Sequence, residues 1–175
     1  MKYLKIYALF VTLLVLGTAV FVTVTPIGGE LRQIVSSEYK HVIHGKVVGI
    51  TDGDTITVLD TYQTQYKIRL AEIDTPEKKQ AFGSKCKQIL SDKIFGKQVE
   101  VGWNTEDRYK RIIGFVSLGD RNINREMVAE GYAWHYKQYS KSKELDAVEE
   151  EARRNKLGLW ADKNPIAPWE YRKKK

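Results

Sequence analysis

Short runs in which hydrophobic and polar residues alternate follow one another in the middle of the chain, and this is the pattern of strands with one buried face. The first three runs are GKVVGI (45–50), TITVLD (55–60) and YKIRLAEID (66–74). The dipeptide Asp52-Gly53 predicts a tight turn after the first run, because glycine tolerates the positive φ that hairpin turns need. The pattern therefore predicts a three-stranded meander in a domain that starts near His44.

After the third run the hydrophobic residues change to a helical spacing. Phe82, Cys86, Ile89 and Leu90 recur every three or four residues, which predicts a helix that ends at Phe95-Gly96. Two more strand-like runs then follow, QVEVGW (98–103) and RIIGFVSL (111–118). The predicted strands are thus three before this helix and two after it.

Two further helical patterns follow the last strand. Either Asn122 or Asn124 is suited to cap a short helix that ends at Gly131, and a longer helix is predicted within 143–155. Three strands, a helix, two strands and two helices predict an α+β fold, a five-stranded OB-type β-barrel with three packed helices. Such barrels serve many functions, so the fold alone does not supply one.

The N-terminal segment has a different pattern, because no charged residue occurs from Ile6 to Gly29. A bilayer span needs roughly 17 to 25 apolar residues, whereas the core of a signal peptide has about 7 to 15. The apolar run from Tyr7 to Val24 therefore favours an uncleaved transmembrane anchor at 1–25 over a cleaved signal peptide, and both stay open. Lys2 and Lys5 before the run favour a cytoplasmic N-terminus, with the rest of the chain outside the cytoplasm.

The remaining boundaries come from composition. Glycine, proline and serine with little periodicity predict a linker at 26–43, the folded domain is expected at 44–162, and 163–175 is predicted to be a basic tail. The tail ends in Arg172-Lys173-Lys174-Lys175, a sequence that is most often solvated but is also suited to bind a nucleic-acid backbone or a membrane surface.

Charge and cysteine content narrow the classes of partner and of metal site. The 29 lysines and arginines against 22 acids give a formal charge of +7, which favours a polyanionic partner such as nucleic acid or an anionic membrane surface. Cys86 is the only cysteine, so an intrachain disulfide and a cysteine-based metal cluster are both excluded.

Two aspartates lie at strand ends that a small barrel brings together: Asp54 opens the second strand and Asp74 ends the third. Facing carboxylates repel unless a cation or proton joins them, and Ca²⁺ accepts carboxylate and carbonyl oxygens in irregular, hydrated geometry. Thr75 precedes Pro76, so its backbone is biased to the extended form and its carbonyl is free of a helix. The alternatives stay open that Asp52-Gly53-Asp54 is only a turn and that Asp74 and Glu77 only form a helix capping box.

Two arginines are placed to join these acids. Arg69 lies in the third strand between Ile68 and Leu70, and Arg111 opens the fifth. A lone arginine is by default a surface residue. Two guanidinium groups that converge on a carboxylate-bound cation would instead bind a phosphate through paired hydrogen bonds, as lysine cannot.

With these residues in view, the chain resembles the thermonuclease family, also called staphylococcal or micrococcal nuclease. The similar segments are DGDT (52–55), RLAEIDTPE (69–77) and DRYKR (107–111), and the resemblance covers about 44–162. It implies a calcium-dependent endonuclease that hydrolyses phosphodiester bonds in DNA or RNA and leaves 3′-phosphate ends. By this resemblance Asp54, Asp74 and the Thr75 carbonyl bind calcium, and the catalytic residues are Arg69, Glu77 and Arg111.

The substrate-binding residues predicted around this centre are Tyr109, Arg108 and Tyr139. Aromatic rings stack on bases of any sequence, although plain packing is an equal alternative for both tyrosines. The chain departs from the staphylococcal enzyme in the short loop after Glu77 and in Lys110, which stands where that enzyme has glycine. The short loop leaves open how Glu77 is positioned.

The leading hypothesis is therefore a monomeric calcium nuclease that is anchored in the membrane with its domain outside the cytoplasm, or secreted or periplasmic if the segment is cleaved. The rival hypothesis is a catalytically inactive OB-type module that binds nucleic acid at the membrane. The rival would not require Glu77 or the paired aspartates.

Overall fold

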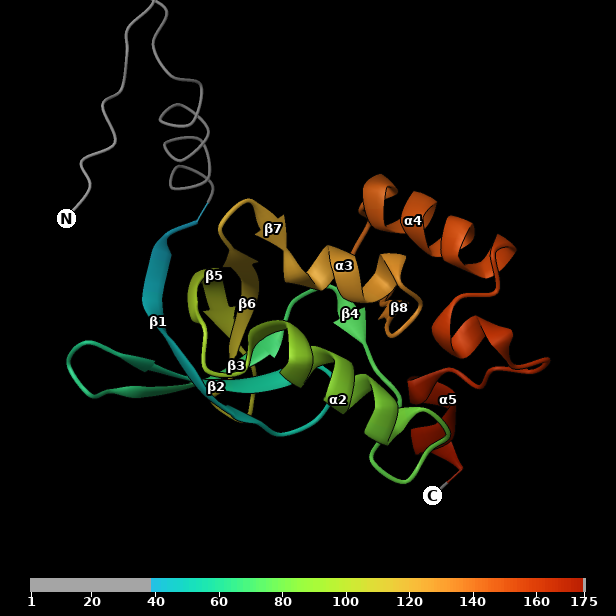
Figure 1. The fold of residues 1–175 in the computed structure, drawn as a ribbon, viewed down its shortest axis with the longest axis horizontal. Coiled ribbons are helices and arrows are strands. Elements are labelled where there is room, and N and C mark those ends of the chain that lie inside the picture. Colours follow the sequence, from blue (N-terminus) through green and yellow to red (C-terminus); the bar gives the residue numbers. More distant parts are fainter. Residues whose placement is uncertain (1–38, 175) are drawn as a thin grey trace, which may run out of the picture.

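The computed structural model describes residues 39–174, which form a closed β-barrel of five strands with helices packed around it (Figure 1). The barrel strands pair in the order β3-β2-β1-β5-β6, and a parallel pairing of β3 with β6, in which Ile68 is opposite Ile112, closes it. The predicted five-stranded barrel is confirmed. Its strands are β1 (His41–Ile50), β2 (Thr55–Asp60), β3 (Gln65–Leu70), β5 (Gln98–Glu106) and β6 (Ile112–Leu118).

The alternation of the strands fills the barrel interior with aliphatic side chains. One residue in two along each strand faces inward, so the apolar positions of the sequence runs become the core. Six strand residues have no exposed surface: Val47, Ile56, Val58, Ile68, Val101 and Val116. This core fixes the register of the strand ends, where the candidate acids and arginines lie.

Three short strands depart from the predicted runs. The run 66–74 is interrupted at Glu72, which has a positive φ of 64°, so that β3 ends at Leu70. Beyond Glu72, β4 (Ile73–Asp74) leaves the barrel and pairs with β8 (Trp134–His135). The third, β7 (Arg121–Asn122), extends the sheet beside β6. The separate pairing of β4 sets Asp74 opposite Trp134, at the edge of the barrel.

Secondary structure extends past both ends of the predicted domain, 44–162. β1 begins at His41 and not near His44, because its first residues pair with β5, with His41 opposite Trp103. The predicted tail 163–175 contains a fourth α-helix, α5 (Pro168–Lys173), which the sequence analysis did not include. Proline at the first helical position suits α5, since its missing N–H would have no helical partner there.

The other helices agree with the predicted segments. They are α2 (Gly83–Ile94), α3 (Ile123–Ala129) and α4 (Lys143–Arg154), with a 3-10 helix η1 (Gly158–Ala161) after them. Of the two candidate caps of α3, Asn122 is the one whose side chain accepts a hydrogen bond from the Arg125 N–H. Asn124 is buried and joins α3 to the barrel through hydrogen bonds with Ala71, Gly114 and Val116.

A second, smaller core holds the C-terminal part of the chain. Trp134 contacts the rings of Trp160 and Trp169 edge-on, and the Tyr136 ring stacks on Trp169 with 5.3 Å between centroids. In Figure 1, α5 lies next to the first turn of α2, on the side of the barrel away from the β2–β3 hairpin. The C-terminal helix is thus fixed against the molecule.

The predicted anchor or signal at 1–25 and most of the predicted linker lie outside the described residues. Within residues 39–174, none of the helices has the length and hydrophobicity that a bilayer span requires.

Glu126 joins three elements and gives the fold a specific pH dependence. Hydrogen bonds from Arg121, together with the nearby Lys93 ammonium, lower the pKa of Glu126 from 4.5 to about 2. A lowered pKa stabilises the fold above pH 4.5, and this stabilisation is lost as the pH falls toward 2. We expect Glu126→Gln to lower the free energy of unfolding by only about 1 kcal/mol at pH 7, because partial exposure screens these pairs. At pH 2 we expect no measurable effect, since the stabilisation by the charged carboxylate is then lost.

Denaturant unfolding at the two pH values tests this expectation, with Glu150→Gln on exposed α4 surface as a control of equal charge. An equal loss of stability at both pH values would show that Glu126 acts through packing and not through its charge.

Candidate active site

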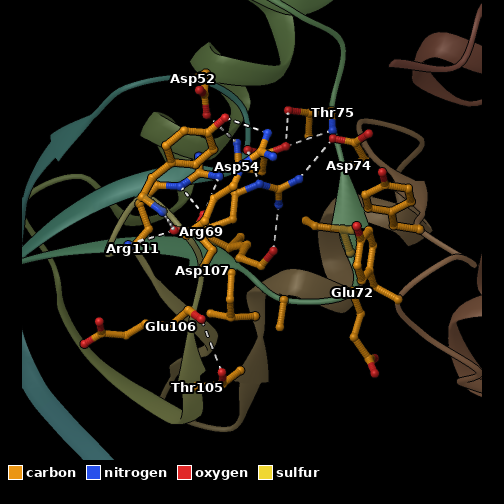
Figure 2. A pocket seen from close by; sticks show the side chains of 18 of the residues that line it. Asp52, Asp54, Arg69, Glu72, Asp74, Thr75, Thr105, Glu106, Asp107 and Arg111 are labelled. Carbon is orange, nitrogen blue, oxygen red and sulfur yellow. Dashed lines mark hydrogen bonds and ion pairs between the residues drawn. The ribbon is translucent and has the colours of Figure 1, made fainter. Parts of the chain in front are cut away.

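A cavity opens where the end of β3, the start of β2, the β5–β6 loop and α5 meet (Figure 2). Every residue predicted to bind metal or to act in catalysis lines it, as do the three predicted substrate-binding residues. Segments far apart in sequence are therefore brought to one place by closure of the barrel. The lining also includes residues that were not predicted to belong to the site, among them Asp52, Glu72, Tyr136 and Arg172.

At the floor of the cavity, Arg69 joins the two candidate metal carboxylates (Figure 2). Its Nε lies 3.2 Å from Asp54 Oδ1, and its Nη2 donates to Asp74 Oδ1 at 3.0 Å. The third guanidinium nitrogen, Nη1, donates to the Leu70 carbonyl at 2.7 Å, so the group is held at three points. One N–H on each Nη remains for another acceptor, such as a phosphate oxygen.

Thr75 ties the two strand ends to each other. Its backbone N–H and its hydroxyl donate to Asp54 Oδ2 at 2.9 and 2.8 Å, so β4 is held directly against the start of β2. Gly53 permits this approach, because a Cβ there would lie 2.7 Å from Thr75 Oγ1. The prediction that Gly53 supplies a positive φ is wrong, since its φ is not in that region, and the glycine is needed for space.

The turn interpretation of Asp52 and the metal interpretation of Asp54 fit together. Asp52 Oδ1 accepts from the Asp54 N–H at 3.2 Å, which is ordinary turn chemistry, while the Asp54 carboxylate faces Arg69 and Thr75. Burial and the nearby charge of Asp54 raise the pKa of Asp52 to about 6. Burial also raises the pKa of Asp74, although hydrogen bonds from Arg172 and the charge of Arg69 oppose it. The raised pKa values of Asp52 and Asp74 indicate that burial disfavours their charged forms more than the nearby hydrogen bonds and cations favour them.

These acids fit a calcium ion as a partial ligand set. Asp54 and Asp74 are 5% and 2% exposed. One oxygen of each carboxylate contacts the Arg69 guanidinium, so the two acids are held close together. Among residues 39–174 no cluster of three or more histidine, cysteine or acidic side chains is suited to a metal. The two carboxylates would therefore need carbonyl and water oxygens to complete the shell, which Ca²⁺ accepts.

Arg111 lies on the other wall of the cavity and is held by Asp107. Its Nε and Nη2 lie 2.8 and 2.7 Å from Asp107 Oδ2, and its backbone N–H donates to Asp107 Oδ1. This i,i+4 pair closes the β5–β6 loop and aims the guanidinium from a fixed base. Arg111 and Arg69 thus line one cavity from neighbouring strands, as a phosphate site requires.

The predicted substrate-binding residues form two aromatic groups at the cavity mouth. Tyr109 is 65% exposed, Arg108 donates to its hydroxyl at 2.7 Å, and the guanidinium of Arg111 lies 5.6 Å from its ring. Tyr139 is 69% exposed and packs edge-on against Tyr136. Exposed rings that are held at fixed positions are suited to stack on bases.

The loop that carries Tyr136 and Tyr139 is supported by His135, which was not predicted to belong to the site. His135 is 1% exposed, and its two ring nitrogens lie 2.9 Å from Asp146 Oδ1 and 2.8 Å from Ser140 Oγ. The imidazole thereby joins the loop to the start of α4.

Glu77 lies at the rim, with its side chain 36% exposed, and does not belong to a helix. The capping-box alternative is wrong, because α2 begins only at Gly83. The Glu77 N–H donates to Gln80 Oε1 at 3.1 Å and its carbonyl accepts from the Gln80 N–H at 2.8 Å. This compact turn leaves the Glu77 carboxylate free to face the cavity.

Arg172 of α5 contacts both Asp74 and Glu77, so the predicted tail is not a solvated segment at this position. Its Nη2 donates to Asp74 Oδ2 at 2.8 Å, and its Nη1 donates to Glu77 Oε1 at 3.0 Å. The signal that could have indicated α5 is Pro168-Trp169, a proline suited to begin a helix followed by a large apolar residue. The charge run itself contains no sign of its partners.

Comparison with known proteins decides the family. The profile of the family described as "Staphylococcal nuclease homologue" matches residues 67–162, more than half of the chain. The chain belongs to the staphylococcal nuclease family. It is therefore a nuclease, an enzyme that hydrolyses phosphodiester bonds.

Bacterial relatives agree over most of their own length. A protein named "Uncharacterized endonuclease" from Haemophilus influenzae is 48% identical over 128 residues, which cover 73% of this chain and 72% of that protein. One of the same name from Escherichia coli is 44% identical over 134 residues, covering 76% of this chain and 87% of that protein. A protein named "Micrococcal nuclease" from Shigella flexneri is 46% identical over 140 residues, covering 74% and 80%. The resemblance noted from three motifs thus extends through the nuclease domain.

Proposed function

We propose that this member of the staphylococcal nuclease family is a calcium-dependent endonuclease that cleaves DNA and RNA and leaves 3′-phosphate ends. The observation that carries the proposal is the buried pair Asp54 and Asp74, joined by Arg69 at the floor of a cavity that also holds Glu77 and Arg111. A silent nucleic-acid-binding module would have no need to bury two carboxylates at a cost in solvation and aim them into one cavity.

In this proposal Asp54, Asp74 and the Thr75 carbonyl hold calcium, which when bound supplies positive charge beside the phosphoryl oxygens. Arg69 and Arg111 donate hydrogen bonds to these oxygens and stabilise the charge that develops on them in the transition state. Glu77 orients the attacking water and accepts its proton. The water oxygen bonds to phosphorus as the bond from phosphorus to the 5′ oxygen breaks; this oxygen takes up a proton from solvent, and the phosphate stays on the 3′ side.

The cavity mouth supports an unspecific nucleic-acid substrate. Tyr109 and Tyr139 are exposed rings in the cavity lining, and Arg108 adds a cation beside Tyr109. Base stacking of this kind is tolerant of sequence, so we propose that a single-stranded stretch of either DNA or RNA lies across the mouth.

Removal of the metal tests the proposal directly. We expect the full-length protein to cleave end-labelled DNA and RNA in calcium and to lose at least about a hundredfold in rate when the calcium is chelated, because the phosphoryl charge is then uncompensated. Asp54→Asn should give the same loss in the presence of calcium, whereas Asp60→Asn, at the other end of β2 and outside the cavity lining, should not.

The ends of the products and the binding of the substrate separate the hypotheses. Products whose 5′ ends accept a label without phosphatase treatment, but whose 3′ ends need phosphatase before they can be extended, would agree with 3′-phosphate ends. Nucleic-acid binding without cleavage at any calcium concentration would favour the inactive module.

We also propose that the apolar segment 1–25 holds the nuclease outside the cytoplasm, as a membrane anchor or as an export signal. Fractionation of cells into membranes, periplasm and medium tests it. Activity in the membrane fraction that salt does not extract is the result expected for an anchor, and activity confined to the cytoplasm would contradict both forms.

A further inference from the structure

The C-terminal segment after η1 is docked on the loop that carries Glu77. Pro168 is buried and Trp169 stacks on Tyr136, so α5 has a fixed position at the cavity. Its neighbour in space is the short turn 77–80, which the sequence alone leaves without an evident support. Helix α5 is held by the packing of Trp169 and contributes Arg172 to the cavity lining, so it is a part of the cavity wall.

Hydrogen bonds from side chains to backbone carbonyls connect the two segments. Gln80 Nε2 donates to the Ile166 carbonyl at 2.7 Å, and the Tyr171 hydroxyl donates to the Lys79 carbonyl at 3.2 Å. The other end of the Gln80 amide, Oε1, accepts from the Glu77 N–H at 3.1 Å. Gln80 thereby transmits the position of the C-terminal segment to the backbone of Glu77.

Arg172 adds a contact to the carboxylate itself. Its guanidinium bridges Glu77 Oε1 at 3.0 Å and both oxygens of Asp74, at 2.8 and 3.3 Å, while its side chain is 40% exposed and lines the cavity. A planar guanidinium fixes the relative orientation of two acids, which a single ammonium group cannot do. The carboxylate of Glu77 is thus tied to Asp74 on the cavity floor.

We propose that Arg172 is a positioning residue of the nuclease, and that the docked C-terminal segment orients Glu77 where the short loop does not. The inference rests on the proposed function, because it assigns a role toward the Glu77 carboxylate. It concerns the placement of that carboxylate and requires no contact between Arg172 and the substrate.

Steady-state kinetics on four variants of the full-length protein tests it: Arg172→Gln, Arg172→Lys, Lys173→Gln and Glu77→Gln. We expect Arg172→Gln to lower kcat by roughly ten- to a hundredfold with KM changed less than about threefold, because a misplaced catalytic group slows chemistry more than binding. Arg172→Lys should restore part of kcat. Lys173→Gln removes the same charge from the exposed neighbouring position and should stay within about twofold of the wild type.

Hydrogen exchange in calcium-free protein gives a readout that does not depend on activity. The Glu77 and Gln80 amides donate within the turn, so they should exchange faster in Arg172→Gln and at the wild-type rate in Lys173→Gln. Unchanged exchange in Arg172→Gln would overturn the proposal.

Other outcomes also decide against it. A raised KM at unchanged kcat would mean that Arg172 binds substrate, and faster cleavage by Arg172→Gln would mean that it competes with the cation for Asp74. If Glu77→Gln is inactive but Arg172→Gln equals Lys173→Gln, this inference fails alone. If Glu77→Gln keeps full activity, the proposed function of Glu77 fails first.

Discussion

Arg69→Gln is expected to lower kcat/KM for DNA cleavage by roughly 10³ to 10⁵, the range found when an arginine that stabilises phosphoryl charge is lost. The Arg69 guanidinium forms ion pairs with both Asp54 and Asp74, and it keeps two N–H groups for a phosphate. Steady-state kinetics in saturating calcium measures the loss. Lys67→Gln, an exposed change of equal charge on the same strand, should leave the rate within about twofold.

The same variant carries a second signature in stability. Removing the guanidinium leaves two buried carboxylates without their shared cation, and breaking a buried pair costs roughly 3 to 5 kcal/mol. Arg69→Gln should therefore melt well below the wild type in chelator, and added calcium should restore more stability to it than to the wild type, since the ion would replace the lost charge. Activity within tenfold of the wild type would refute the assignment of Arg69.

Glu77→Gln is expected to lower kcat by roughly 10² to 10⁴, the usual contribution of a positioned general base, with little change in KM. Glutamine has the same shape and can still accept the hydrogen bond from Arg172, so the loop should keep its position. It cannot accept a proton from water. Single-turnover cleavage rates, together with calcium binding by calorimetry, separate this loss from a loss of metal.

Glu72→Gln is the matched control, because Glu72 also lines the cavity and has the same charge. It should cleave at a rate close to that of the wild type. The reverse result, in which Glu72→Gln is slow and Glu77→Gln is not, would assign the general base to Glu72, at the break between β3 and β4.

The barrel could be predicted because its strands are local patterns. Alternation along β2 and β5 states which side chains face inward, and burial of Val58 and Val101 follows from it. The alternation in 66–74 changes phase at Leu70-Ala71, which is compatible with a break, but the pairing of β4 with β8 beyond Glu72 could not be predicted this way. A pairing between residues 60 positions apart leaves no local mark in either segment.

The residues of the site were likewise predictable only in part from the sequence. Asp54, Arg69, Asp74 and Glu77 were identified by residue type and by a family resemblance that the comparisons confirm for the family as a whole. The sequence did not indicate that Gly53 serves for space and not for φ, because that depends on how close Thr75 approaches. The roles of the individual residues stay predictions until the variants above are measured.

By itself the sequence determined the five-stranded barrel, the order of its five strands and the types of residue at the strand ends. It also determined the basic charge of the chain and the apolar segment near its N-terminus. These features depend on short-range periodicity and composition. Only the tertiary structure decided that the predicted tail is a helix, and that Arg172 meets Asp74 and Glu77 across 98 and 95 positions of sequence. A charged residue in a basic run is compatible with many partners. Which acids it meets depends on where the tryptophan cluster docks the helix, and that is set by packing between distant segments.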